Sequence, residues 1–230
     1  MVTSIALADV VADALGISRE SGQLHLKTIR AAGEISFKGY GRAAAEMTPL
    51  DAARLLIAAA GSTFAKDSMD VLKRFAKLKP VRPRSSGHTL EEFLAVRIGA
   101  LPIDENDSES ERSRFLPRRP FGSVRLADTA VQLFDPIGSK DDDLPSFALV
   151  RWLSPIGDSK VLLFGREVDR PWQKGTSEGS SMETGTSISD ILERYEKHRF
   201  FQVRVVRRTA LIDIAEGLKG LTPSGNISSN

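Results

Sequence analysis

Residues 7–35 read LADVVADALGISRESGQLHLKTIRAAGEI, and this stretch decides how the front of the chain folds. Its first half repeats apolar residues at the spacing of one buried helix face, which predicts a helix from about Ser4 to Leu15. Gly16 can end that helix in a left-handed conformation, and the hydroxyl of Ser18 can cap a second helix over residues 18–32. The sequence therefore predicts two short helices joined by a tight turn.

One residue of the second helix departs from a simple amphipathic pattern. Gly22 stands inside the helix, where glycine costs about 1 kcal/mol relative to alanine. Two interpretations are open at this point. Either the helix is marginal, or another segment of backbone packs so closely against it that no side chain fits.

A basic segment that contains two glycines follows the helices. Residues 34–37 and 43–47 are expected to form two short strands around the turn KGYGR at 38–42. Thr48-Pro49-Leu50-Asp51 then combines a capping residue, a proline at the first helical position and an acid in the first turn. These signals predict an apolar helix to about Ala60, and further helices are expected at 67–78 and 89–100.

The pattern changes in the second half of the chain. Strands separated by Gly, Pro and Asp turns are predicted at 123–126, 130–134, 147–153, 160–166 and 200–206. Helices are predicted at 187–198 and 209–218. Residues 79–88 and the polar, charged run after residue 101 are expected to be linkers. A small antiparallel sheet covered by one or two helices fits this half.

Composition narrows the class of protein. The chain has 230 residues and no cysteine, which excludes disulfides and thiolate metal sites. No apolar run approaches the roughly 20 residues that span a bilayer, and no secretory signal is recognised, so we expect a cytoplasmic protein with no membrane partner.

Charge is distributed unevenly along the chain. Residues 1–88 hold 13 Lys and Arg against 8 Asp and Glu, whereas residues 89–230 hold 19 against 22. A basic front half is a modest indication of nucleic-acid binding.

The turn and the second helix also share residues with a known pattern, namely Leu15-Gly16-Ile17-Ser18, Ser21, His25, Leu26, Ile29 and Gly33. Together with the glycine turn after them, these residues resemble the winged helix-turn-helix of DNA-binding regulators. In that family the second helix enters the major groove, and the hairpin contacts the neighbouring backbone or minor groove. The resemblance covers about residues 5–50. The run from Gly41 to Ala58 is also similar to uncharacterised prophage-type proteins of proteobacteria.

The resemblance completes the predicted organisation, which is α+β with an N-terminal winged helix-turn-helix, a helical middle segment and a C-terminal small antiparallel sheet. We expect a DNA-binding domain at 1–62, a helical connector or dimerisation segment at 63–101, a flexible linker at 102–120 and an α+β domain at 121–222. The apolar helices 49–60 and 67–78 suggest a homo-oligomer, although core packing explains them nearly as well.

The function that the resemblance implies is sequence-specific binding of double-stranded DNA by a transcriptional regulator, possibly encoded by a prophage or mobile element. Side chains that hydrogen-bond phosphates or base edges are the expected contacts. On the second helix they are Arg19, Ser21, Gln23, Lys27 and Thr28. On the hairpin they are Lys38, Tyr40 and Arg42.

Three alternatives stay open: a component of phage DNA replication or packaging, a protein-interaction module that uses helix 18–32, and an enzyme with its site in the C-terminal domain. The sequence offers little support for catalysis. His25, His88 and His198 have no ligand spacing, and acidic runs such as Asp141-Asp142-Asp143 are typical of solvated loops. We therefore expect no enzymatic activity, no cofactor and no metal.

Overall fold

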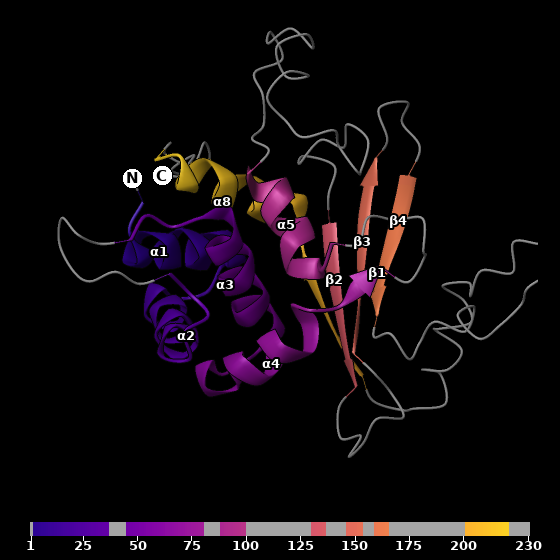
Figure 1. Cartoon of the computed structure of the whole chain (residues 1–230), viewed down its shortest axis with the longest axis horizontal. Coiled ribbons are helices and arrows are strands. Elements are labelled where there is room, and N and C mark those ends of the chain that lie inside the picture. Colours follow the sequence, from indigo (N-terminus) through magenta and orange to yellow (C-terminus); the bar gives the residue numbers. More distant parts are fainter. Residues whose placement is uncertain are drawn as a thin grey trace, which may run out of the picture.

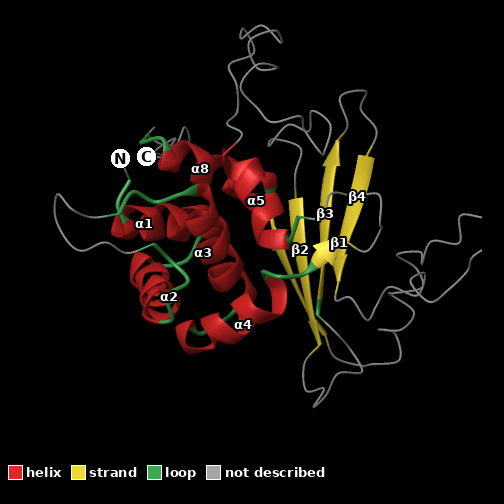
Figure 2. Cartoon of the chain, viewed as in Figure 1, coloured by secondary structure: helices red, strands yellow, loops and turns green. Residues whose placement is uncertain are grey.

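The computed structural model describes residues 2–36, 45–80, 88–99, 130–136, 146–153, 159–165 and 201–220. Within these ranges the chain is α+β, with helices in the N-terminal part and strands mainly in the C-terminal half, as the sequence predicts. Figure 2 shows the helices gathered on one side of the sheet. A continuous hydrophobic core joins the helices to the near face of that sheet.

The first two helices have the boundaries that the sequence predicts. Helix α1 covers Ser4–Leu15 and α2 covers Arg19–Ala31. Gly16 ends α1 with a φ of 68°, a left-handed conformation that glycine adopts without strain. The hydroxyl of Ser18 accepts a hydrogen bond from the Ser21 amide at 3.2 Å, which caps α2.

Close packing against α1 explains why α2 contains Gly22. A Cβ atom at this position would lie 2.8 Å from the Ala12 Cβ and 2.8 Å from the Ala8 carbonyl oxygen. Any larger residue would push the two helices apart. Of the two interpretations of Gly22, close approach of another backbone is therefore the correct one.

The predicted hairpin after α2 is only partly visible, because residues 37–44 lie outside the described ranges. Its described ends, 34–36 and 45–47, are irregular rather than strands. Their backbone amides bond elsewhere: Ser36 N–H donates to the Asp51 carboxylate at 2.9 Å, and Met47 N–H donates to the Val2 carbonyl at 3.1 Å. The strand prediction for these end residues is wrong, because the segment is tied to α3 and to the N-terminus instead.

Helix α3 (Pro49–Gly61) lies at the centre of the helical layer, as Figure 1 shows. Thr48 and Asp51 form a complete capping box, as their spacing suggests. Residues on all sides of α3 are buried, at 5% exposure or less: Ala52, Ala53, Leu55, Leu56, Ile57, Ala58 and Ala59. Neighbours within the same chain cover this apolar surface, so it gives no reason to expect a dimer.

The next helices extend around α3. A short 3-10 turn, η2 (Ala65–Asp67), leads into α4 (Ser68–Phe75), which ends earlier than the predicted helix at 67–78. Helix α5 (Leu90–Gly99) closely matches the prediction at 89–100. The buried carboxylate of Glu91 on α5 pairs with Arg54 of α3 at 2.8 Å and also with Lys77. These ion pairs join α5 to α3 and to the chain after α4.

Among the described residues the sheet is antiparallel, with five strands in the order β1-β4-β3-β2-β5. The strands are β1 (Lys79–Pro80), β2 (Ala130–Pro136), β3 (Phe147–Leu153), β4 (Ser159–Gly165) and β5 (Phe201–Val206). The four C-terminal strands lie close to their predicted positions. Strand β1 begins in a segment predicted to be a linker, and its pairing with β4 ties the helical part of the chain to the sheet. The strand predicted at 123–126 and the helix at 187–198 lie outside the described residues.

The inner face of the sheet packs against helices from the N-terminal half of the chain. Leu133, Ala148 and Phe164 are buried there, and the Phe164 ring meets Phe93 of α5 edge-on at 5.4 Å. Helix α8 (Arg208–Leu218) reaches back to α1, where Gly217 leaves room for Val10 (Figure 1). The core thus includes residues from the predicted segments 1–62, 63–101 and 121–222. Their boundaries as independent domains stay a prediction.

Candidate nucleic-acid interface

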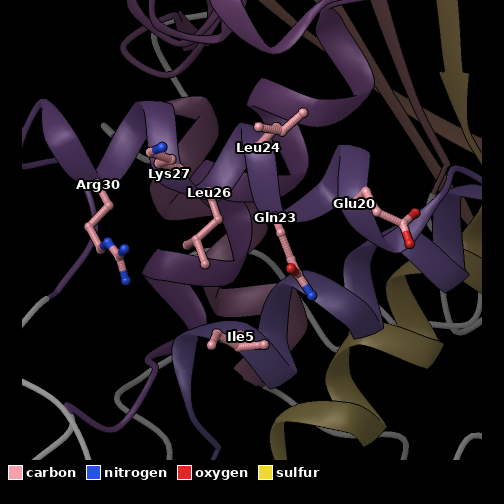
Figure 3. Close-up of a pocket in the computed structure, with 7 residues that line it drawn as sticks. All are labelled: Ile5, Glu20, Gln23, Leu24, Leu26, Lys27 and Arg30. Carbon is pink, nitrogen blue, oxygen red and sulfur yellow. The ribbon is translucent and has the colours of Figure 1, made fainter.

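The outward surface of α2 is the candidate site, because the helix is buried on one side only. Its inner side is formed by Gly22, His25, Leu26 and Ile29. We call the opposite side, with Glu20, Gln23, Leu24, Lys27 and Arg30, the outward face of α2. Together with Ile5 of α1 and the edge of Leu26, this face lines a shallow depression with a volume of about 430 Å³ (Figure 3).

Two of the predicted DNA contacts are engaged with acidic residues of α1. The Arg19 guanidinium forms a two-pronged interaction with the Asp13 carboxylate, with N–O distances of 3.2 and 2.9 Å. This interaction raises the pKa of Arg19. The Gln23 amide donates to Asp9 at 2.9 Å. These two side chains therefore fix the α1–α2 pair, and Asp9 and Asp13 place negative charge beside the N-terminal half of α2.

The other predicted contacts on α2 differ in exposure. Lys27 is exposed on the outward face. Ser21 and Thr28 are half-buried, and the Thr28 hydroxyl donates to the Leu24 carbonyl of its own helix at 3.0 Å. The hydroxyl oxygen of Thr28 can still accept a hydrogen bond. The predicted hairpin contacts Lys38, Tyr40 and Arg42 lie outside the described residues.

The sequence analysis missed four members of this surface: Ile5, Glu20, Leu24 and Arg30. Arg30 lies three residues after Lys27 and lines the same depression, a relation that helical spacing alone could have revealed. Ile5 and Leu24 are exposed aliphatic side chains, at 58% and 54%. The exposure of Ile5 depends on how α1 packs against α2, which no local pattern reports.

His25 is buried on the inner side of α2. Its Nδ1 atom lies 2.7 Å from the hydroxyl of Ser68, at the start of α4. That hydroxyl donates its one hydrogen to the Ala65 carbonyl at 2.6 Å. We therefore assign the hydrogen of the neutral ring to Nδ1, because Ser68 can only accept. Burial lowers the pKa of His25, and the positive charge of Arg204 lowers it further.

Arg204 of β5 links the sheet to the same region. Its guanidinium donates to the Ala60 carbonyl at 3.1 Å and to the Thr63 hydroxyl at 2.7 Å. A cation at the end of α3 is favourable, because the last carbonyls of a helix carry partial negative charge. The sheet edge, the end of α3 and the inner side of α2 therefore form one polar cluster behind the candidate interface.

No metal-binding cluster is found in the described part of the chain. No group of three or more His, Asp or Glu residues there is arranged to hold a metal ion. The acidic residues 141–143 lie outside it. None of the helices in the described ranges is long and apolar enough to cross a membrane.

No protein-family model, curated protein or solved structure matches this chain. Its function must therefore be argued from the geometry of its own residues.

Proposed function

We propose that this protein binds double-stranded DNA through the outward face of α2 and acts as a transcriptional regulator. The observation that carries the proposal is the two-helix arrangement. A tight turn holds α2 against α1, the core fixes its inner side, and its outward face carries the exposed Lys27 and the half-buried Arg30. A helix of this kind fits the width of the major groove. Cytoplasmic location belongs to the same proposal, and so does a prophage or mobile-element setting, which rests on resemblance alone.

The expected contacts are shifted toward the C-terminal half of α2. Lys27 and Arg30 are the phosphate-binding candidates, with Thr28 beside them, because both cations line the outward face of α2. Arg19 and Gln23 interact with Asp13 and Asp9. Carboxylates beside the N-terminal half of α2 repel phosphates, so we expect DNA to approach the other half most closely. Ser21, Lys38, Tyr40 and Arg42 remain in the proposed contact set.

The first test is a titration of fluorescent random-sequence duplex DNA with the full chain at several salt concentrations. Each phosphate contact releases counterions, so affinity falls as salt rises. Replacing both Lys27 and Arg30 with alanine is expected to lower the slope of log affinity against log salt by about 2. The matched control is Lys79→Ala, which removes an exposed charge from the sheet edge and is expected to leave the slope unchanged.

Two results would contradict the proposal. One is the absence of wild-type binding at low salt. The other is an equal decrease of the salt slope in Lys79→Ala and in the Lys27/Arg30 variant. That result would mean that DNA binds to positive charge anywhere on the surface and not to α2 in particular. If binding is confirmed, selection of preferred duplexes from a random pool separates a sequence-specific regulator from a protein that binds any DNA.

A further inference from the structure

Two large aliphatic side chains are exposed to solvent on the surface formed by α1 and α2. Ile5 is 58% exposed and Leu24 is 54% exposed, and both line the same depression. DNA presents mainly charged and polar groups, and thymine methyl groups are its main apolar feature in the major groove. Binding to DNA therefore gives Ile5 and Leu24 little reason to be exposed together.

We propose that this depression binds an amphipathic helix of a partner protein, with acidic residues of that helix facing Lys27 and Arg30. Its volume of about 430 Å³ is enough for a few aliphatic side chains. Figure 3 shows Ile5 on the α1 side and Leu24 on the other flank of α2. A helix that crosses α2 would cover both with apolar residues at the i, i+3 or i+4, and i+7 positions.

The charges along the depression define the chemistry of the partner. Lys27 and Arg30 lie near the C-terminal end of α2, and Glu20 lies at the opposite end (Figure 3). A partner helix with Asp or Glu in its first turn satisfies two requirements at once. Its carboxylates pair with Lys27 and Arg30, and they also stabilise the partial positive charge at its own N-terminus. We therefore place the acidic N-terminal turn of the partner beside these two cations.

The proposed binding surface is preorganised. Leu26 is 3% exposed and belongs to the hydrophobic core, so it forms a fixed floor. Gln23 is held by its hydrogen bond to Asp9 at 2.9 Å. A surface that is already ordered loses little conformational freedom on binding. This inference goes beyond DNA binding and does not depend on it, although both ligands would use Lys27.

The test uses a display library of random 14-residue peptides, selected on the full chain and, in parallel, on Leu24→Glu. Leu24 is exposed, so circular dichroism and the thermal midpoint should show an unchanged fold. Peptides selected on the wild type are expected to combine helically spaced aliphatic residues with Asp or Glu. Their affinity should fall at least tenfold on Leu24→Glu. On Arg30→Glu it should also fall, because the carboxylates of the peptide then face a like charge.

Equal enrichment on the wild type and on Leu24→Glu would overturn the inference, and so would selected peptides without acidic residues. The result is separable from the DNA titration. If no helical peptide is selected but DNA binding remains salt-dependent, only the proposed partner helix is rejected. Peptide binding without DNA binding rejects only the regulator.

Discussion

Helices α2 and α3 each contain 13 residues, but their surroundings are opposite. Helix α3 is buried on every side by α1, α2, α4, α5 and the sheet, so its residues are fixed by packing. Helix α2 is buried along one side and carries cations, an acid and the exposed Leu24 along the other. Helix α3 therefore has a structural role, whereas the outward residues of α2 do not contribute to the core. Those outward residues are available to bind a ligand.

The largest expected effect comes from equivalent substitutions on the two helices. Leu56 of α3 is 1% exposed, so Leu56→Ala leaves a cavity and should lower the unfolding free energy by about 3 kcal/mol. Leu24→Ala removes the same atoms from an exposed site and should change it by less than about 0.5 kcal/mol. Urea unfolding measures both. Similar losses in the two variants would show that the outward face of α2 is covered in solution.

A smaller effect is expected at the contact between α1 and α2. Alanine forms helices better than glycine by about 1 kcal/mol, yet Gly22→Ala would place a methyl group 2.8 Å from the Ala8 carbonyl oxygen. Overpacking costs typically about 1–3 kcal/mol, so we expect net destabilisation of about 1 kcal/mol. Ser21→Ala, in the same helix, is the control and should be close to neutral. A stabilised Gly22→Ala would mean that α1 and α2 are not in close contact.

The smallest effect is a dependence of stability on pH through His25. Its pKa is lowered in the folded chain, so as the pH falls the unfolded chain takes up the proton first. The unfolding free energy should be unaffected above about pH 6.5, the ordinary histidine value, and should decrease from there toward the folded pKa. We expect the urea unfolding midpoint to decrease as the pH falls from 7 to 5.

The variant that tests this dependence is His25→Asn, which keeps a donor near Ser68 but does not titrate. It should lower the overall stability and flatten the pH profile between 5 and 7. Identical slopes in the wild type and His25→Asn would show that His25 does not govern the acid response.

Local sequence patterns were sufficient to predict the positions of most of the described helices and strands. The spacing of apolar residues located α1, α2 and α3, because a helix buried on one side repeats every three to four residues. Gly16, Ser18 and Thr48 marked the helix ends, because capping depends on neighbouring backbone groups. Strand-like segments separated by Gly, Pro and Asp turns predicted the positions of β2 to β5.

Other features depend on residues that are far apart in the chain. The hairpin prediction failed at its described ends because Ser36 and Met47 bond to Asp51 and Val2 instead of to each other. Strand β1 exists because Pro80 lies opposite Phe164 of β4. No local pattern could have revealed that Arg19 and Gln23 are engaged with Asp13 and Asp9.

The sequence by itself therefore determined the fold class and the helix boundaries at the front, because these follow from periodicity and capping. Only the tertiary structure decided which face of α2 is available and what it carries. Helices α1, α3 and α4, together with η2, bury one side of α2. The residues left outside are selected by long-range packing, which one-dimensional patterns do not encode.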